Sequence, residues 1–355
     1  MDRNILITGG AGFVGSNLAI SFSQKPGIKV AALDNLKRRG SELNLPRLKR
    51  NGVAFIHGDI RNPEDLELDF TPDVIIECSA EPSVLAGYNS SPSYLLNTNL
   101  CASINCLEAA RKWRADFIFL STSRVYPIEK LNFLKFTENC TRFELNRNQT
   151  FRGASGNGIS HEFSLEGHRS LYGMTKLCSE HLFEEYHAMY GLRGVVNRCG
   201  VIAGPWQMGK IDQGVFVHWV GSHYFKKDLS YFGYGGTGKQ VRDLLHIDDL
   251  FTLIEWQVEN LDKVNGKVFN IGGGKNVSLS LHETTSLCNE ITGNKVNIKE
   301  QMKEREADVR IYMSDTCHAY NIMGWKPRKN APEILKDIFE WIKGNEADVR
   351  GVLFS

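Results

Sequence analysis

The chain has 355 residues and a formal net charge of +1, because 42 lysines and arginines nearly balance 41 aspartates and glutamates. This balance disfavours a general nucleic-acid binder, and a hydrophobic content of 42% disfavours a disordered chain. No apolar run reaches the roughly 18 residues of a membrane helix, and the N-terminus does not resemble a signal peptide, so we expect a cytoplasmic protein. The eight cysteines show no CxxC or zinc-site spacing, which predicts reduced thiols and no metal site.

Short apolar runs alternate with stretches of helical spacing through the first half of the sequence. The apolar runs predict strands at residues 3–8, 28–33, 53–57, 74–78 and 117–120. The helical spacing predicts helices at residues 12–24 and 92–113. Near-continuous apolar strands separated by helices are typical of a parallel sheet covered on both faces, whereas an antiparallel α+β sheet would show alternation. We therefore expect an α/β fold, a Rossmann-type doubly wound parallel sheet.

The pattern changes after the fifth predicted strand. Residues 127–169 are polar and show little periodicity, and an irregular stretch of this length inside a domain usually has a function. Helical spacing returns at residues 172–190, a strand is expected at 194–197, and an amphipathic helix is expected at 332–343.

A glycine-rich turn follows the first predicted strand and opens the first predicted helix. Gly9, Gly12 and Gly15 are spaced as GxxGxxG. Such glycines let the backbone approach a pyrophosphate, and the helix N-terminus offers free N–H groups to it. Asp34 ends the second predicted strand, where a carboxylate binds ribose hydroxyls and repels a 2′-phosphate. The pattern predicts NAD in preference to NADP, and we interpret the basic residues 37–39 as a solvated turn.

Asp59 closes the third predicted strand within the sequence His-Gly-Asp-Ile. A carboxylate at the carboxyl end of a parallel strand lies in the crevice where ligands bind, so Asp59 is a candidate for the adenine amino group. From the residues alone, a simple turn aspartate is nearly as well supported.

Tyr172 and Lys176 are four residues apart at the start of a predicted helix and therefore share one face. An ammonium near a phenol lowers the pKa of the phenol, which can then exchange a proton with a hydroxyl under oxidation. Such a pair alone is more often an ordinary surface pair. The hydroxyl-rich segment 121–126, after the fifth predicted strand, favours the catalytic interpretation because it lies over the same crevice.

Seven segments that carry these features occur in order along nearly the whole chain: TGGAGFVGS (8–16), HGDI (57–60), NTNL (97–100), STSRVY (121–126), YGMTK (172–176), VRDLLHIDDL (241–250) and FNIGGG (269–274). By these segments the chain resembles the extended short-chain dehydrogenase/reductase family, the nucleotide-sugar epimerases and dehydratases. The resemblance implies that Tyr172 is the acid/base, that Lys176 holds the nicotinamide ribose and tunes Tyr172, and that Thr122 bonds the sugar hydroxyl.

The resemblance also implies two sets of binding residues. The NAD site would comprise Gly9, Gly12, Phe13, Val14, Gly15, Asp34, Asn35, Asp59, Ile60, Ala80, Asn99, Tyr172, Lys176 and Cys199. The substrate site would comprise Glu81, Ser123, Arg124, Gln213, Arg242 and Arg305, with the two last arginines gripping the diphosphate.

A two-domain organisation follows from the length and the resemblance. We expect an NAD-binding Rossmann domain over residues 1–200 and a smaller, discontinuous substrate-binding lobe over 201–355, with segments near 236–275 able to return to the first domain. A homodimer or higher homo-oligomer is expected from the family.

Further segments resemble one subgroup, the 2-epimerases of CDP-activated dideoxysugars, which implies a role in lipopolysaccharide O-antigen biosynthesis. They include DNLKRRG (34–40) and READVR (305–310). The chain departs from the family pattern in two segments. Pro127 follows Val-Tyr where the family usually has glycine, and Glu77 and Glu81 occur in the segment 77–82, where the family often has histidine. A UDP-sugar 4-epimerase, a decarboxylase or dehydratase, and a non-catalytic NAD-sensing protein remain alternatives.

Overall fold

The computed structural model describes residues 3–88, 90–209 and 213–354. These residues fall into two compact units, which are described separately below. The first unit comprises residues 1–122, 171–197 and 251–268, and the second comprises residues 123–170, 198–250 and 269–355. Residues 123–170 thus group with the second unit, although they precede the predicted boundary at residue 200. The assignment of cofactor and substrate binding to separate domains stays a prediction.

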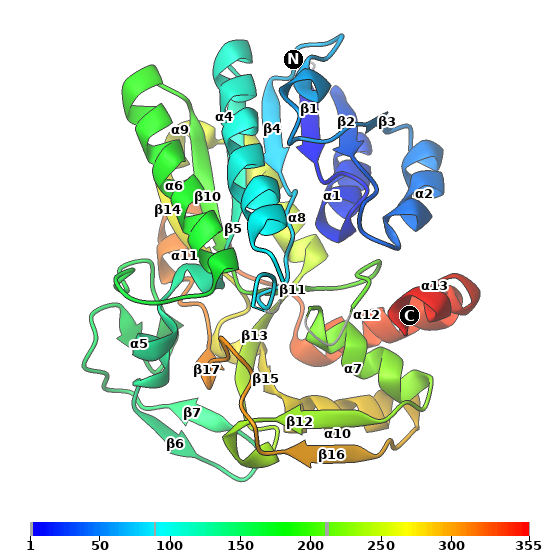
Figure 1. Cartoon of the computed structure of the whole chain (residues 1–355), viewed down its shortest axis with the longest axis vertical. Helices are drawn as coiled ribbons and strands as arrows, with labels where there is room; N and C mark the ends of the chain where they lie inside the picture. Colours follow the sequence, from blue (N-terminus) through cyan, green and yellow to red (C-terminus); the bar gives the residue numbers. More distant parts are fainter. Residues whose placement is uncertain (1–2, 89, 210–212, 355) are drawn as a thin grey trace. The chain divides into compact units, whose positions relative to one another are not determined.

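The central element is a seven-stranded sheet in the order β14-β10-β5-β4-β1-β2-β3 (Figure 1). In that order the strands span Lys267–Ile271, Gly194–Cys199, Asp116–Thr122, Val74–Glu77, Arg3–Thr8, Ile28–Asp34 and Ala54–His57. The five strands from β5 to β3 pair in parallel. Their apolar residues are buried because helices cover both faces, which confirms the predicted α/β, doubly wound fold.

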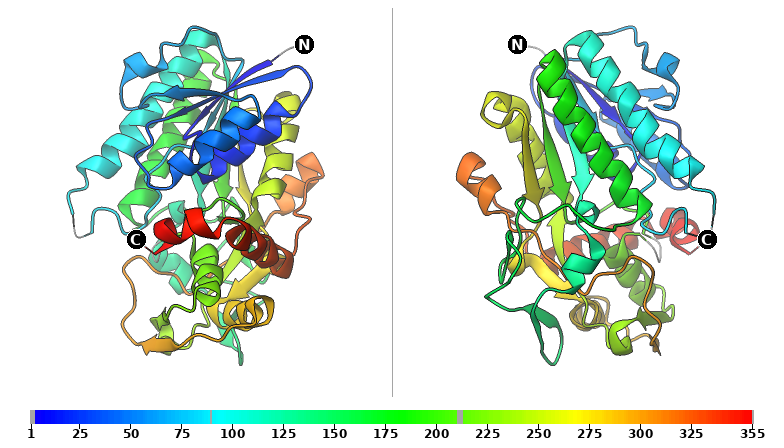
Figure 2. Two further views of the ribbon diagram at one scale, coloured as in Figure 1. Left: turned by 90° about the vertical axis from the view of Figure 1, so that its right-hand side faces the viewer. Right: turned by 60° about the vertical axis from the view of Figure 1, so that its left-hand side comes forward.

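Helices α4 (Ala102–Trp113) and α6 (Leu171–Tyr190) lie side by side on one face of this sheet (Figure 2). Phe117 of β5 points to this face and stacks on Phe183 of α6, with ring centroids 6.1 Å apart. Burial of one such ring contributes about 1.5–3 kcal/mol. Helix α1 (Phe13–Ser23) packs on β1 and β2, and residues 251–259 of α8 lie beside α1.

The helix predicted over residues 92–113 is interrupted. The structure has α3 (Ser93–Leu96), a wide π-helical turn (Asn97–Cys101) and then α4. Apolar spacing does not reveal a wide turn, because one extra residue hardly changes the pattern.

The prediction that residues 127–169 lack regular structure was wrong. This segment contains helix α5 (Ile128–Asn132) and two short antiparallel pairs, β6 (Phe136–Glu138) with β7 (Phe143–Leu145) and β8 (Ala154–Ser155) with β9 (Gly158–Ile159). Strands of two or three residues are too short to show a period in the sequence.

The second unit contains small sheets and several helices. Strand β13 pairs with β11, β15 and β17, and β12 pairs with β16. These strands span Val241–His246, Val201–Ala203, Ser278–Ser280, Ile311–Tyr312, Leu229–Phe232 and Ile298–Gln301. Helices α7 (Val215–Tyr224), α10 (Leu281–Thr292) and α12 (Ala331–Gly344) pack on one another. Asn330 and Glu333 form a capping box at the start of α12, near the predicted position.

Five further helices complete the described part of the chain. They are α2 (Leu45–Arg50), α8 (Ile247–Glu259), α9 (Leu261–Val264), α11 (Cys317–Met323) and α13 (Glu346–Leu353). All eight cysteines are free thiols. No helix in the described part of the chain is both long and apolar enough to cross a membrane. The described residues also contain no group of three or more histidine, cysteine or acidic side chains suited to a metal ion.

Candidate active site

The glycine-rich turn between β1 and α1 needs glycine for two reasons. Gly9 has a φ of 64°, in the left-handed region, and a Cβ there would lie 2.9 Å from the backbone of Ser79. A Cβ on Gly15 would lie 2.2 Å from the carbonyl oxygen of Gly9. The turn is therefore folded back tightly on the first turn of the helix.

The same turn leaves the start of α1 suited to an anion. Gly12 precedes the helix in an extended conformation, and its N–H donates to the Gly9 carbonyl at 3.0 Å. Phe13 and Val14 are the first helical residues, and both are half-buried. The N–H groups of a helix N-terminus lack intrahelical partners, and the helix dipole favours negative charge there. A glycine turn of this shape fits the pyrophosphate of a dinucleotide.

Asp34 ends β2 beside this turn. Its carboxylate accepts hydrogen bonds from the Ala11 N–H at 3.1 Å and from the Leu36 N–H at 2.7 Å. Burial raises the pKa of the Asp34 carboxyl above its ordinary value, while these N–H donors act to lower it. The structure thus places the predicted ribose-binding carboxylate against the glycine-rich turn, within the same unit.

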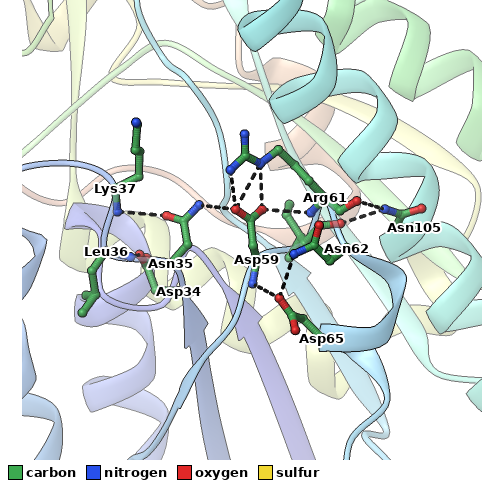
Figure 3. Close-up of polar contacts among 10 residues, drawn as sticks. Asp34, Asn35, Leu36, Lys37, Asp59, Arg61, Asn62, Asp65 and Asn105 are labelled. Atoms are coloured by element: carbon green, nitrogen blue, oxygen red, sulfur yellow. Dashed lines mark hydrogen bonds and ion pairs between the residues drawn. The ribbon is translucent and has the colours of Figure 1, made fainter.

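The Asp59 carboxylate is held by the side chains of Arg61 and Asn35, which together are called the Asp59 clasp (Figure 3). The sequence did not predict the contact with Arg61. Arg61 Nε donates to both carboxylate oxygens, at 2.9 and 3.0 Å, and Arg61 Nη2 donates to Oδ2 at 2.5 Å. Asn35 Nδ2 donates to the same Oδ2 at 2.9 Å. These donors, with Arg61 first, hold the pKa of Asp59 well below its usual range. The Arg61 guanidinium also lies 5.5 Å from the centroid of the Tyr94 ring.

Two further polar residues near the glycine turn were not predicted. Arg47 donates to Asn44 Oδ1 at 2.6 Å and to Asn17 Oδ1 at 3.0 Å, and Asn44 Nδ2 donates to the Ala11 carbonyl at 2.8 Å. Burial lowers the pKa of Arg47 to about 10. Residues 44 and 47 lie outside any motif in the sequence, so only the fold reveals their position.

Ile60, the residue after Asp59, is buried. Its carbonyl accepts a hydrogen bond from Asn105 Nδ2 of α4 at 2.9 Å (Figure 3). Asn105 is therefore a further residue near Asp59 that the sequence did not predict.

Asn99 lies in the wide turn before α4 and is fully buried. Its side-chain oxygen accepts the Glu81 N–H at 2.7 Å, and its Nδ2 donates to the Glu81 carbonyl at 3.0 Å. One amide thus pairs with both backbone groups of Glu81. This pairing fixes the loop after β4, which carries the half-buried Ala80.

Tyr172, Lys176 and Thr122 all belong to the first unit. Tyr172 is in the first turn of α6 and is half-buried, and Lys176 follows one turn later and is only 2% exposed. Lys176 Nζ lies 4.6 Å from the centroid of the Phe119 ring on β5. Thr122 is the last residue of β5 and is buried, and α6 packs against β5. A buried ammonium one helical turn from a phenol can stabilise the phenolate.

The predicted substrate residues are split between the two units. Glu81 is in the first unit, and the others are in the second. Ser123 and Arg124 begin a short 3₁₀ turn, and Arg124 Nη1 donates to the Ala307 carbonyl at 3.1 Å. Gln213 is half-buried, and Cys199, predicted to touch the cofactor, is buried at the end of β10.

The two predicted diphosphate-binding arginines differ in their surroundings. Arg242 Nη2 donates to Asp308 Oδ1 at 2.8 Å and to the Val309 carbonyl at 2.6 Å. The Arg305 guanidinium lies 4.0 Å from the centroid of the Phe232 ring. Arg242 is therefore engaged in an ion pair of its own unit, whereas Arg305 lies over an aromatic face.

Comparison with known proteins assigns this arrangement to a family. The sequence model of the "NAD dependent epimerase/dehydratase family" matches residues 5–272. The chain is also 32% identical to the CDP-paratose 2-epimerase of Salmonella typhi, over 95% of this chain and 98% of that protein. The chain belongs to the NAD dependent epimerase/dehydratase family. This membership confirms three predictions: the family, that the protein is an enzyme, and that its cofactor is NAD.

Other family members are similar over the whole length. The putative UDP-glucose 4-epimerase of Methanocaldococcus jannaschii is 27% identical over 96% of this chain and 99% of that protein. The crystal structure of Thermotoga maritima UDP-glucose 4-epimerase with UDP-glucose matches with a TM-score of 0.76 at 26% identity, over 97% of this chain and 99% of that chain. The fold therefore agrees with that of a solved member of the family.

Proposed function

We propose that the protein inverts carbon 2 of a CDP-activated 3,6-dideoxyhexose, as a CDP-paratose/CDP-tyvelose 2-epimerase. The observation that carries the proposal is the 32% identity to CDP-paratose 2-epimerase over almost the full length of both chains. The subgroup-like segments 34–40 and 305–310 agree with it. Such a sugar nucleotide would serve O-antigen biosynthesis in the cytoplasm.

In the proposed reaction Tyr172 removes the proton from the hydroxyl on carbon 2 of the sugar. NAD, when bound, accepts the hydride from the same carbon and returns it, so the reaction is redox-neutral overall. Lys176 stabilises the Tyr172 phenolate, and Thr122 bonds the sugar hydroxyl so that its proton points to Tyr172. After the ketone has turned, Tyr172 gives the proton back while hydride enters from the other face.

Each cofactor-side residue has a part in this proposal. The glycine turn and the start of α1 would hold the pyrophosphate, Asp34 would bind the adenosine ribose, and Asp59 would bind the adenine amino group. Asn99 would keep the loop with Ala80 and Glu81 in place through the amide pairing described above. The tight glycine turn and the Asp34 carboxylate beside it support this assignment.

On the substrate side we assign the main role to Arg305. Its stacking on Phe232 presents a guanidinium and an aromatic edge from one place, which suits a diphosphate next to a base. Arg242 would contribute with its remaining donors, because Asp308 and the carbonyls of Val309 and Val241 already accept hydrogen bonds from it. Ser123, Arg124 and Gln213 stay proposed contacts of the sugar nucleotide. A homodimer or higher oligomer is also part of the proposal.

The test is incubation of the purified protein with CDP-paratose, CDP-tyvelose and a panel of UDP-, GDP- and dTDP-sugars, with the products identified by NMR. Interconversion of the two CDP-sugars is expected, with the other sugars inert. Inversion at carbon 4 of a UDP-sugar, with the CDP-sugars inert, would replace the proposal with a 4-epimerase. Loss of water or carbon dioxide would point to a dehydratase or a decarboxylase. Binding of NAD with no conversion of any sugar would favour a sensing protein.

A further inference from the structure

Glu77 is a buried acid on the face of the sheet that α4 and α6 cover. It is the last residue of β4 and is 1% exposed. In the sheet register it lies between Thr8 of β1 and Phe119 of β5. Residues in register on neighbouring strands point to the same face, so Glu77 lies next to the ring over which Lys176 is placed.

The hydrogen bonds of Glu77 indicate where its proton is. Ser103 Oγ lies 2.5 Å from Glu77 Oε1 and 2.9 Å from the Asn99 carbonyl oxygen. A serine hydroxyl has one proton, so it can donate to only one of these two acceptors. If Ser103 donates to Asn99, Glu77 must donate to Ser103, which requires a protonated carboxyl.

The other side of the carboxyl group leads to the same state. Glu77 Oε2 is buried and has no hydrogen-bond donor among the described residues. Thr8, which pairs with Glu77 in the sheet register, supplies none, because its buried Oγ1 has no partner among them either. A buried carboxylate needs donors to both oxygens, and leaving one without a donor is costly. The neutral acid needs only the single contact that Ser103 supplies.

Two titratable groups act on Glu77 from the helices packed against β4. They are Lys176 on α6 and Cys106 on α4, and both are buried. Burial raises the pKa of Glu77, and the Lys176 ammonium and the Ser103 hydroxyl only partly oppose it. Burial also raises the pKa of Cys106 well above its ordinary value, which favours its neutral thiol.

We propose that Glu77 is a positioning residue that keeps its proton in the working enzyme and donates it to Ser103, which in turn donates to the Asn99 carbonyl. This chain of hydrogen bonds holds the wide turn whose Asn99 side chain pairs with Glu81. A neutral Glu77 also places no negative charge beside Lys176, so Glu77 does not weaken the effect of Lys176 on the Tyr172 phenol. The second consequence rests on the proposed function; the protonation state does not.

Infrared difference spectroscopy tests the protonation state directly. Wild-type protein should show the carbonyl stretch of a protonated carboxyl at neutral pH, and E77Q should lack that band. The matched control is E180Q, because Glu180 is a second buried glutamate on this face, hydrogen-bonded to Ser121. The band should persist in E180Q. Loss of only carboxylate bands in E77Q would overturn the proposal. Should E77Q fail to fold, ¹³C-glutamate labelling of wild-type protein and of E180Q assigns the band to a glutamate other than Glu180.

The pH dependence of turnover tests the link to Lys176. E77Q carries an uncharged hydrogen-bond donor at the same place. The acid limb of its profile of turnover against pH should therefore coincide with that of the wild type. If Glu77 were an anion, its removal would strengthen the field of Lys176 at Tyr172 and shift the limb to lower pH. Such a shift would overturn the proposal. The infrared result decides the protonation state of Glu77 even if Tyr172 proves not to be the base. A failure of this proposal can therefore be distinguished from a failure of the proposed function.

Discussion

Tyr172 is the side chain on which the proposed chemistry depends most. Y172F removes only the ionisable oxygen, so turnover should fall by roughly 10²–10⁴-fold, the effect of one positioned proton-transfer group, while folding is retained. Y190F is the matched control, because Tyr190 lies on the same helix and is 54% exposed. Steady-state kinetics and circular dichroism of both variants are the measurements. Near-normal turnover of Y172F would remove Tyr172 from its role.

Arg61 gives a second prediction at the residue scale. R61A frees the Asp59 carboxylate from its clasp, so Asp59 would have to be ordered by the incoming adenine. NAD binding should weaken by up to about tenfold, which corresponds to ~1.4 kcal/mol. Calorimetry on protein stripped of NAD measures it, with R111A as the control, because Arg111 makes a similar pair with Glu108 on an exposed part of α4. Unchanged or tighter binding in R61A would contradict the role of the clasp.

The sequence predicted those candidate residues whose partners are close in the chain. The glycine spacing, Asp34 at a strand end, and Tyr172 four residues before Lys176 are local patterns. The contacts of Arg47 with Asn17 and of Ser103 with Glu77 could not be predicted, because they join residues that only the fold brings together. The pairing of Arg242 with Asp308 was missed for the same reason.

At the scale of elements, the β1–α1 turn is the most constrained connection. A Cβ at position 15 would meet the backbone of residue 9 at 2.2 Å, and backbone cannot move aside cheaply. G15A should therefore destabilise the first unit and abolish NAD binding. G351A is the control, because nothing lies within 4 Å of a Cβ there and the residue is inside α13. That variant should gain about 0.5–1 kcal/mol from the better helix former. A G15A protein that binds NAD normally would contradict this account.

Elements were predicted well where they are long and apolar. The parallel strands from β5 to β3 and helix α6 were predicted to within two residues of their ends, since buried runs and helical spacing are strong signals. The π-helical turn at Asn97–Cys101 depends on side-chain contacts of Asn99 and left no mark in the apolar pattern. The strands between residues 136 and 159 are too short for any period.

The whole molecule should show a pH-dependent stability that traces to buried acids. Asp243 is fully buried in the second unit, and burial raises its pKa from 3.8 to about 6, although the Ser314 and Gly274 N–H groups oppose this. Between these two pH values the folded protein binds more protons than the unfolded chain, so the free energy of unfolding falls as pH rises.

D243N cannot titrate and isolates this effect. From pH 4 to pH 7 the free energy of unfolding of the wild type should fall relative to D243N by ~2 kcal/mol, at about 1.4 kcal/mol for each unit of pKa shift and with the unfolded carboxyl already partly ionised at pH 4. Denaturant titrations across this pH range measure the difference. A constant difference between the two proteins, or one that grows in favour of the wild type, would contradict an elevated pKa of Asp243.

For the molecule as a whole, composition and strand pattern predicted the α/β class, and the family membership confirmed the enzyme and its cofactor. The number of subunits stays a prediction, because it depends on surfaces and not on the motifs of one chain. The identity of the sugar stays a proposal, since the names of similar proteins refer to different sugar nucleotides.

The central claim is that one NAD takes a hydride from carbon 2 of the sugar and returns it to the same carbon. CDP-paratose deuterated at carbon 2 tests this in ordinary water, with the product analysed by NMR and mass spectrometry. The account predicts CDP-tyvelose that retains the deuterium at carbon 2, because hydride on the nicotinamide does not exchange with solvent during a turnover. Product that has lost the deuterium to solvent would show proton abstraction at carbon 2 and would contradict the hydride mechanism.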